Sequence, residues 1–416
     1  MTAGSARSAT DRGKARNLWP DAEVDAAKLK ELGWQPTPFS EFIIKMHNRC
    51  NLACNYCYVF EMADASWREK PKTISSEVIE QAAARIAAHV TAHGLPGVRV
   101  VFHGGEPLLA GTDLIAQAAA TLRHALPRGT RLDLRIQTNG VGLTESVLGV
   151  LLDQDIQVSV SLDGDSATHD RHRTYRHGGG SFDDVAPALG RLGTERFRRL
   201  FAGLLCAIDM TADPIRTYGA LLEFDPPAVD FLLPHGNWSS PPPGRTAGSR
   251  GTPYADWLIE IFEHWYGAPA RETSIRLFEE IIVLLLGGSS RLESIGLSPV
   301  NLLVVDTDGS LEQVDTLKSA FNGAPALGLN VFDHSFDTAL EQPTIIARQI
   351  GLAALAEQCR SCPVVRICGG GYYPHRYRAG HGFRQPSIFC PDLLRLINHI
   401  DRRVAADLAR RVDSAW

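Results

Sequence analysis

The sequence predicts an α/β fold in which a parallel sheet curls into a partial or full barrel, followed by a small module stapled by metal. Short apolar runs alternate with segments of helical period between about residues 39 and 233, which is typical of a parallel sheet with crossover helices. Each conspicuous motif comes directly after one of these runs. Such folds place their chemistry at the carboxyl ends of the strands, so the motif positions agree with the fold.

The strands are expected where the apolar runs lie, at residues 39–45, 98–103, 132–137, 157–162, 201–208 and 229–233. The helices are expected at residues 75–93, 112–126, 144–154, 182–192, 217–222, 255–266, 275–286 and 392–412. Ser75 or Ser76 is expected to cap the first of these helices, because a serine hydroxyl accepts a hydrogen bond from an unpaired backbone N–H of the first turn.

The chain is expected to divide into five parts. They are a mobile N-terminal arm (1–38), the barrel (39–238), a linker loop with bridging helices (239–298), a cysteine-bearing module (299–395) and a C-terminal helix (396–416). The linker begins with SSPPPGRTAGSRGTP, whose proline, glycine and serine content indicates a loop or a domain boundary.

Composition and charge exclude several classes of protein. The 416 residues are 44% hydrophobic and 21% charged, which is ordinary for a globular chain. A formal net charge of −5 offers no basic surface for nucleic acid. No apolar run approaches the roughly 20 residues of a membrane span, and residues 1–16 lack the apolar core of a secretory signal. We therefore expect a cytoplasmic protein with neither nucleic acid nor membrane as a partner.

Seven of the eight cysteines are clustered, and in a reducing compartment clustered thiols indicate metal more often than disulfides. The first group, CNLACNYC, places Cys50, Cys54 and Cys57 close together in the chain. Structural tetrahedral sites usually take four protein ligands, so the fourth position here is left open for another molecule. Three thiolates suit three irons of a [4Fe–4S] cube. Zinc with His47 as fourth ligand, and three unligated thiols, stay open as alternatives.

The C-x3-C-x2-C spacing after a first strand, with Tyr56 beside the last thiol, resembles the motif of the radical S-adenosylmethionine (SAM) enzymes. In that superfamily the open iron binds the amino and carboxylate groups of SAM. One electron from the cluster cleaves SAM to methionine and a 5′-deoxyadenosyl radical. The resemblance implies an enzyme with a partial (β/α)6-type radical SAM barrel.

Further motifs match the same superfamily position by position. The resemblance assigns SAM binding to Tyr56, Gly104, Gly105, Glu106, Thr138, Asn139, Ser161, Asp163 and Arg173. Glu106 belongs to a GGEP motif that contacts the SAM ammonium, and a carboxylate suits a cation. Arg173 ends HDRHR and is assigned to the SAM carboxylate, onto which a guanidinium can fork. For Ser161 and Asp163 a purely structural role in a turn is equally open.

The second cysteine group, C-x2-C-x5-C followed by GGG, resembles the SPASM domain of radical SAM peptide maturases. The resemblance implies that Cys359, Cys362, Cys368 and Cys390 hold one auxiliary [4Fe–4S] cluster, with a structural zinc as the alternative. A SPASM domain usually carries a second auxiliary cluster as well. Here Val314 and Tyr372 stand where that cluster's thiols are expected, so we expect two clusters in total.

Asp315 follows Val314 and matches an aspartate that acts as a base near the substrate in relatives. A general base needs to lie within hydrogen-bond reach of the departing proton. The alternative is a solvated turn acid. Cys206 lies in an apolar run and is expected to be a buried small hydrophobe.

Longer runs resemble the FxsB-like branch of the SPASM maturases, over roughly residues 40–397. They are HNRCNLACNYCYVFEMADASWR, HGGEPLLAG, VSLDGDSATHDRHR, DPPAVDFLLPHGNW and CGGGYYPHRYRAGHGF. This resemblance implies a ribosomally made precursor peptide with an aromatic-containing C-terminal core as substrate, and a flavodoxin- or ferredoxin-type electron donor. It also implies a C–C crosslink from an aromatic ring carbon to an aliphatic β-carbon, which closes a three-residue cyclophane.

Other readings of the function stay open. They are thioether formation, oxidation of a Ser or Cys side chain as in sulfatase maturation, and, more remotely, a zinc-stapled binding protein without activity. Substrate recognition is expected at the barrel mouth, at residues 239–253 or through a partner protein. Tyr372, Tyr373, His375 and Arg376 either line that path or pack beside the auxiliary cluster.

Overall fold

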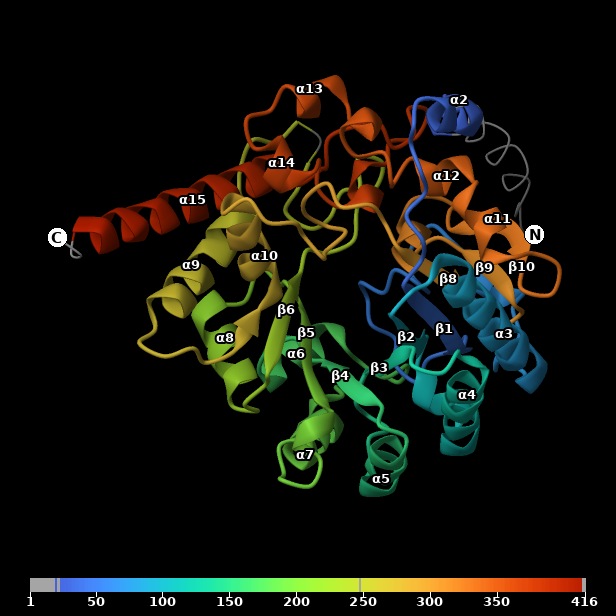
Figure 1. Cartoon of the computed structure of the whole chain (residues 1–416). Coiled ribbons are helices and arrows are strands. Elements are labelled where there is room, and N and C mark those ends of the chain that lie inside the picture. The colour runs from blue at the N-terminus through green and yellow to red at the C-terminus, as the bar shows by residue number, and fades with distance from the viewer. Residues whose placement is uncertain (1–18, 21–22, 247, 414–416) are drawn as a thin grey trace, which may run out of the picture.

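The computed structural model describes residues 19–20, 23–246 and 248–413 (Figure 1), the side chains of residues 411–413 excepted. Residues 1–18 and 21–22 of the predicted arm, and residues 414–416 of the predicted C-terminal helix, lie outside the described residues. The described part of the arm contains α2 (Ala26–Glu31), where the Asp25 side chain accepts a hydrogen bond from the Lys28 N–H at 3.1 Å. The mobility of the arm stays a prediction.

The strands form one ten-stranded sheet in the order β10-β9-β8-β1-β2-β3-β4-β5-β6-β7. The eight strands that follow one another in space as β8-β1-β2-β3-β4-β5-β6-β7 all pair in parallel. Strand β9 pairs antiparallel with both β8 and β10. Their bounds are β1 (Glu41–His47), β2 (Gly97–Gly104), β3 (Arg131–Thr138), β4 (Gln157–Ser161), β5 (Phe201–Ala207), β6 (Ala228–Leu232), β7 (Ser274–Ile275), β8 (Leu302–Val305), β9 (Ser310–Glu312) and β10 (Ala326–Asn330).

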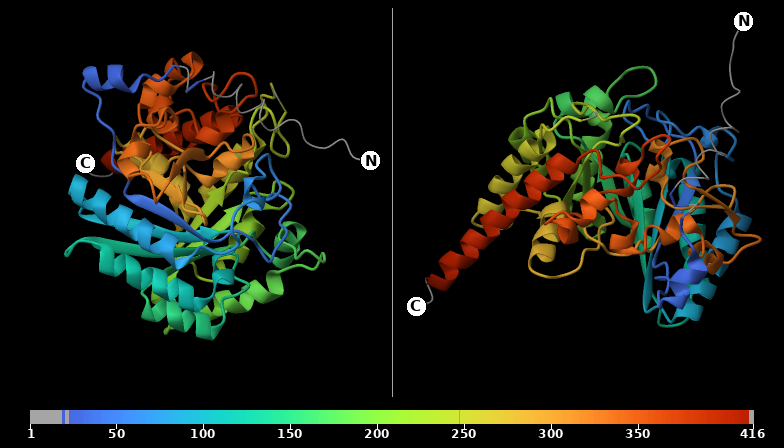
Figure 2. Two further views of the ribbon diagram at one scale, coloured as in Figure 1. Left: turned by 90° about the vertical axis from the view of Figure 1, so that its right-hand side faces the viewer. Right: turned by 90° about the horizontal axis from the view of Figure 1, so that it is seen from above.

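The helices that come between the strands lie mostly outside the curved sheet, whereas the helices after β10 follow the last strand (Figures 1 and 2). Their bounds are α3 (Ser76–His93), α4 (Thr112–Ala125), α5 (Glu145–Asp153), α6 (Ser166–His172), α7 (Phe182–Leu192), α8 (Pro214–Leu222), α9 (Pro253–Gly267), α10 (Arg276–Leu285), α11 (Phe336–Leu340), α12 (Pro343–Ile346), α13 (Glu357–Arg360), α14 (Val365–Cys368) and α15 (Cys390–Asp413). Short 3₁₀ turns are η1 (Ser66–Arg68), η2 (Pro107–Ala110), η3 (Arg198–Leu200), η4 (Asp315–Ser319), η5 (Gly351–Ala354) and η6 (Tyr373–Arg376).

Local sequence signals explain where these helices begin. Ser75 accepts a hydrogen bond from the Val78 N–H at 3.3 Å, which confirms the predicted cap of α3. α8 begins earlier than predicted because Asp213 caps it and Pro214 occupies its first turn. α6 was not expected from its residues, since seven residues are too few to display a helical period.

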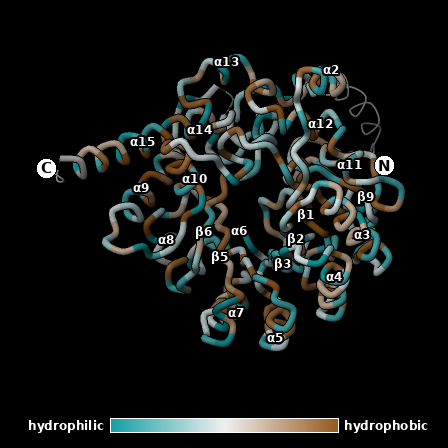
Figure 3. Tube along the Cα trace, viewed as in Figure 1, coloured by the Kyte–Doolittle hydropathy of each residue, from teal (hydrophilic) through white to brown (hydrophobic). Residues whose placement is uncertain are grey.

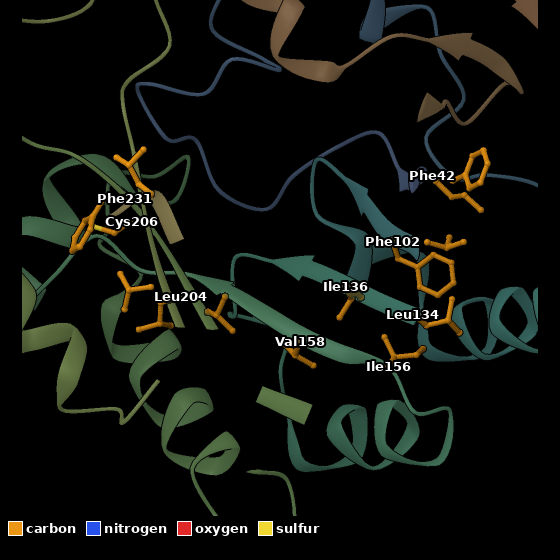
Figure 4. Close-up of a cluster of buried hydrophobic side chains, with 14 of the residues drawn as sticks. Phe42, Phe102, Leu134, Ile136, Ile156, Val158, Leu204, Cys206 and Phe231 are labelled. Carbon is orange, nitrogen blue, oxygen red and sulfur yellow. The ribbon is translucent and has the colours of Figure 1, made fainter. Parts of the chain in front are cut away.

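The core lies between the convex face of the sheet and these helices (Figure 4). In β2 buried and half-buried residues alternate strictly, so one face of the strand packs on helices while the other faces the interior of the curve. Cys206 is fully buried among apolar side chains of β5, as predicted. Figure 3 shows apolar and polar segments alternating along the outer helices α5 and α7, which is typical of amphipathic helices.

The sheet continues across the predicted boundary of the C-terminal module, because β8 pairs in parallel with β1. Beyond β10 the chain has short helices and turns, and α15 then extends away from the body (Figures 1 and 2). α15 begins at Cys390, inside the module predicted over residues 299–395. The division into five parts stays a prediction. None of the described helices combines the length and the apolar character that a membrane crossing requires.

Candidate active site

A cavity of about 1530 Å³ opens at the carboxyl ends of the strands β1–β6. The loops that follow each of these strands line it, and the prolines Pro241, Pro242 and Pro243 of the linker loop close one side. Tyr372 and His375 of the C-terminal module reach the same wall. The structure therefore brings every motif singled out after a strand to one cavity, and it adds the linker loop to its wall.

Cys50, Cys54 and Cys57 all line this cavity on the loop after β1. The loop is tightly turned: the Cys57 N–H donates to the Cys54 carbonyl at 3.1 Å, and the Leu52 N–H donates to the Cys50 sulfur at 3.4 Å. Burial raises the pKa of Cys50 to about 12 and that of Cys57 to about 11. A coordinated metal deprotonates a thiol outright, so these thiols need a metal to become thiolates near neutral pH.

The spacing of the thiols bears on the zinc alternative. Bonds of about 2.3 Å place the sulfurs of a zinc tetrahedron about 3.8 Å apart. Among the described residues, the group with three potential ligand atoms within 4.8 Å of one another is His89, His93 and Asp337, and it includes no cysteine. In the part of the chain that the structure describes, neither cysteine set has three sulfurs within 4.8 Å of one another, so neither is arranged as a ready-made zinc tetrahedron.

The His89 group is itself poorly suited to a metal. The Phe39 N–H donates to His89 Nε2 at 3.1 Å, so the ring proton lies on Nδ1. That Nδ1 lies 2.9 Å from Asp337 Oδ1, to which it donates. Because a metal would need the lone pair of this nitrogen, we interpret the group as a hydrogen-bonded link between α3 and α11.

The GGEP motif packs against the loop after β1. A Cβ on Gly104 would lie 2.2 Å from the His47 carbonyl oxygen, and one on Gly105 would lie 2.4 Å from the Arg49 carbonyl oxygen. Both positions therefore require glycine, and both line the cavity. Only without side chains can this loop approach the cysteine loop so closely.

Glu106 lies behind the cavity wall. Its carboxylate accepts hydrogen bonds from the Thr138 hydroxyl (2.7 Å), the Asn139 N–H (2.8 Å) and the Leu108 N–H (3.1 Å). It is not among the cavity-lining residues. In this structure Glu106 therefore anchors the loop after β3, and its assignment to the SAM ammonium stays a prediction.

The remaining SAM-assigned residues do face the cavity. Thr138, Asn139 and Ser161 line it at the ends of β3 and β4. Asn139 Nδ2 donates to the Cys50 sulfur at 3.6 Å and to Asn51 Oδ1 at 2.8 Å, which ties the loop after β3 to the cysteine loop. Ser161 accepts a hydrogen bond from Gln137 Nε2 at 3.1 Å.

Tyr56, Asp163 and Arg173 form one hydrogen-bonded network, although they come from three different loops. The Tyr56 hydroxyl donates to Asp163 Oδ2 and accepts from Arg173 Nη1 at 2.7 Å. Burial raises the pKa of Asp163, while Arg173 counteracts this shift. Arg173 Nε is buried and has no hydrogen-bond partner in the described part of the chain.

These features fit the cofactor that the resemblance implies. An unpartnered guanidinium N–H beside the cavity suits a carboxylate. Three thiols on one tight loop suit three irons of a cluster. The residues that would hold SAM and its cluster are therefore Arg173, the two glycines and the three cysteines. The individual assignments stay predictions.

The second cysteine set also assembles. Cys359 belongs to α13, Cys362 follows it, Cys368 ends α14 and Cys390 begins α15. Burial raises the pKa of Cys368 to about 12 and that of Cys390 to about 11, and neighbouring thiols of the same set add to both shifts. The four thiols are therefore close enough to interact electrostatically.

The glycines beside this set are structurally required. A Cβ on Gly369 would lie 1.6 Å from the Gly296 carbonyl oxygen. The Arg376 guanidinium donates to the carbonyls of Gly369 and Gly371 at 2.7 and 2.5 Å. Arg376 thus holds the CGGG backbone and does not face the cavity, and Tyr373 packs in a separate apolar cluster. Of the four residues considered for the substrate path, only Tyr372 and His375 line it.

The positions expected for a further cluster are occupied by other interactions. The Val314 side chain is buried in the same apolar cluster as Tyr373. The Tyr372 hydroxyl lies 2.5 Å from the Thr316 hydroxyl. The only cysteine outside the two sets is the buried Cys206.

Asp315 is neither a solvated turn acid nor a cavity-lining base in this structure. Its side chain is 3% exposed, and Lys45 Nζ lies 2.9 Å from one carboxylate oxygen. His103 Nδ1 lies 3.5 Å from the other. Burial raises the pKa of Asp315, but Lys45, His103 and Lys318 together lower it by more, so the pKa ends well below its usual range. The sequence could not show this pairing, because Lys45 lies in a distant strand.

The sequence interpretation did not single out three cavity residues, namely Tyr58, His103 and His235. His235 follows β6, and its ring lies 4.6 Å from the Tyr58 ring between centroids. Its position directly after a strand was the available signal, but an isolated histidine has no spacing partner that would mark it.

Comparison with known proteins agrees with this site. Residues 44–217 match the family model of the radical SAM superfamily. The cysteine-type anaerobic sulfatase-maturating enzyme of Clostridium perfringens is 25% identical over 342 residues, which cover 80% of this chain and 88% of that enzyme. The serine-type enzyme of Klebsiella aerogenes is 24% identical over 362 residues, which cover 83% and 82%. The serine-type enzyme of Bacteroides thetaiotaomicron is 27% identical, but only 60% of its length is covered.

Solved structures show the same fold. anSMEcpe with bound AdoMet has a TM-score of 0.74 and 22% identity, covering 89% of this chain and 98% of that one. Streptococcus suis SuiB bound to the precursor peptide SuiA has a TM-score of 0.53 and 14% identity, covering 86% and 77%. At these sequence identities the structural similarity shows a common fold. The matched part covers most of this chain, from the barrel into the C-terminal module.

Proposed function

The chain carries a radical SAM domain and is an enzyme, and from this premise we propose that it oxidises a side chain of a ribosomally made peptide. The principal product that we propose is the cyclophane crosslink of the FxsB-like branch. The cofactors of the enzyme are SAM and [4Fe–4S] clusters. We propose two clusters, one on the loop after β1 and one on the second cysteine set.

The size of the cavity carries the proposal of a peptide substrate. Its volume of about 1530 Å³ exceeds the roughly 300–1,000 Å³ of a typical small-molecule pocket. Space therefore remains for a peptide segment beside the cofactor. Relatives support this inference, since anSMEcpe was solved with the Cp18Cys peptide and SuiB with its precursor SuiA.

When bound, the cofactor supplies a 5′-deoxyadenosyl radical that removes one hydrogen atom from the substrate. The chain's own residues bind and orient the cofactor and the peptide, and they exclude water from the cavity. Arg173, held by Tyr56, offers its free N–H to the cofactor carboxylate. Gly104 and Gly105 let their loop lie close against the cysteine loop, and Tyr58, Tyr372 and Pro242 line the same cavity.

A second candidate is the oxidation of a Ser or Cys side chain to an aldehyde. The alignment with serine- and cysteine-type sulfatase-maturating enzymes over four fifths of the chain favours it. Both candidates place the same demands on the barrel, because each removes a hydrogen atom, a proton and an electron from one peptide.

The experiment uses the anaerobically reconstituted enzyme, SAM, a chemical reductant and two sets of short synthetic peptides. One set carries Phe or Trp two positions before an aliphatic residue, and the other carries Ser or Cys without aromatic residues. A crosslink removes two hydrogens and makes the peptide resistant to proteolysis. An oxidised Ser also loses two hydrogens, but it reacts with hydroxylamine, so the carbonyl assay separates the two products.

The control is the triple variant Cys50/Cys54/Cys57→Ala, which should form no 5′-deoxyadenosine with any peptide. Formation of 5′-deoxyadenosine by the wild type with no modified peptide in either set would contradict the proposed peptide oxidation. A carbonyl product without a crosslink would replace the first candidate by the second.

A further inference from the structure

His235 and His375 are two histidines of the cavity wall with ring nitrogens that are buried without a hydrogen-bond partner in the described residues, and His235 is the one that follows a strand of the barrel. It lies after β6, at the catalytic edge of the sheet, and its Nδ1 is buried without a hydrogen-bond partner in the described residues. Its ring contacts Tyr58, which directly follows Cys57. The imidazole therefore lies beside the loop that carries the first cysteine set.

The segment after His235 is firmly anchored on the C-terminal module. Asn237 Nδ2 donates to the Ser319 carbonyl at 2.9 Å, and Trp238 Nε1 donates to the Pro386 carbonyl at 2.7 Å. A Cβ on Gly236 would lie 2.7 Å from Pro242. His235 thus lies between β6, which ends at Leu232, and a segment that is hydrogen-bonded to the module. Both attachments position the imidazole without using its nitrogens.

The carboxylates of the cavity wall are engaged elsewhere. Asp163 accepts from Tyr56, and ion pairs join Asp209 to Arg171, Asp230 to Arg276, and Glu293 to Arg348, while Glu61 is solvent-exposed. Asp315 lies behind the wall and is paired with Lys45. A carboxylate that a buried ammonium stabilises is a weak proton acceptor, because protonation would leave that ammonium less well paired.

His235 differs from these groups in its charge state. Burial lowers the pKa of His235 to about 4, so the ring is neutral near pH 7 and keeps one lone pair. The titratable groups that face it are Tyr58, Tyr372 and His375. Burial raises the pKa of both tyrosines and lowers that of His375, so all three are neutral as well.

We propose that His235 accepts the proton that the peptide loses, an inference that rests on the proposed function. One substrate hydrogen leaves as an atom and converts the 5′-deoxyadenosyl radical to 5′-deoxyadenosine. The second leaves as a proton to the imidazole, and the remaining electron goes to the iron–sulfur cluster of the second cysteine set. For the crosslink, a C–H bond breaks at the β-carbon and another at the ring carbon, and one C–C bond forms between them.

The test measures 5′-deoxyadenosine and modified peptide together, on the peptide that the wild type modifies. In His235→Gln, modified peptide per 5′-deoxyadenosine should fall about 100-fold, the scale of a lost general base. Hydrogen-atom removal should continue, since the proton leaves afterwards. His381→Gln, which changes an exposed histidine outside the cavity, should keep the wild-type ratio, and iron content confirms that each variant is loaded.

A rescue experiment excludes a merely structural role. His235→Ala leaves space for added imidazole, and the recovered ratio should rise with the pKa of a series of substituted imidazoles. An unchanged ratio in His235→Gln would overturn the proposal. So would a parallel loss of both products without rescue, or a selective loss in Asp315→Asn alone. If the peptide-oxidation proposal itself were wrong, the wild-type enzyme would already form no modified peptide. The proposed role of His235 would then be wrong as well.

Discussion

Arg173 donates a hydrogen bond to the Tyr56 hydroxyl at 2.7 Å, while its own Nε is buried without a partner in the described residues. An unsatisfied buried N–H of a charged group costs free energy, so a stable site is expected to supply the missing acceptor. Tyr56 lies between Cys54 and Cys57 in the chain, and Arg173 lines the same cavity as these three residues.

Removal of this N–H should weaken SAM binding. We expect the Kd for SAM to rise about 10- to 100-fold in Arg173→Gln, because a hydrogen bond to a charged group contributes about 1.5–3 kcal/mol. Isothermal titration of the reconstituted enzyme with SAM measures the change. Arg171→Gln is the matched control, since Arg171 is exposed and paired with Asp209. An equal loss in both variants would attribute the effect to the overall charge of the cavity.

The cysteine sets predict the iron content. Reconstituted wild type should contain about eight irons, and either Cys50/Cys54/Cys57→Ala or a variant lacking the second set should contain about four. Cys206→Ala should keep about eight, because Cys206 is fully buried in β5 and belongs to neither set. Iron and sulfide analysis under anaerobic conditions decides the matter. About twelve irons would require a third cluster, and zinc without iron would contradict both cluster assignments.

The close contact of Gly369 predicts a selective loss at the second set. Gly369→Ala should lose about four irons, because its Cβ would lie 1.6 Å from the Gly296 carbonyl oxygen and displace the end of α14 that carries Cys368. Gly380→Ala has the same left-handed backbone but open space around its Cβ, so it controls for backbone strain. SAM binding should survive in both variants. Full iron content in Gly369→Ala would show that the loop can move without losing its cluster.

The pairing of Asp315 predicts a structural effect. Asp315→Asn should lower the free energy of unfolding at pH 7 by about 1–3 kcal/mol, because it leaves Lys45 with one fewer buried charge partner. The folded-state pKa is lowered, so the stabilisation is full above the ordinary aspartate pKa near 3.9 and is lost as the pH falls below it. Thermal unfolding of the reconstituted enzyme at pH 7 measures the change. Asp308→Asn, which changes a partly exposed carboxylate that pairs with Lys70, should change it by less than about 0.5 kcal/mol.

A good part of the fold followed from local patterns. The apolar runs located the barrel strands, and the serine before α3 located a helix start. The cysteine loop was visible because its three thiols are neighbours in the chain, so their spacing records the geometry of one tight turn. The sequence did not predict the short helix α6 or the early start of α8, because caps and short turns leave a weaker sequence pattern than a sustained helical period.

The sequence by itself determined that this chain forms parallel βα units and that it has two sets of clustered thiols, one of three and one of four cysteines. Only the tertiary structure decided that Arg173 meets Tyr56, that Glu106 turns behind the wall, that Asp315 pairs with Lys45 and that His235 keeps a free nitrogen. These contacts join residues that are far apart in the chain. Their formation depends on how the strands pair and how the loops close over one edge of the sheet, and no local spacing encodes that packing.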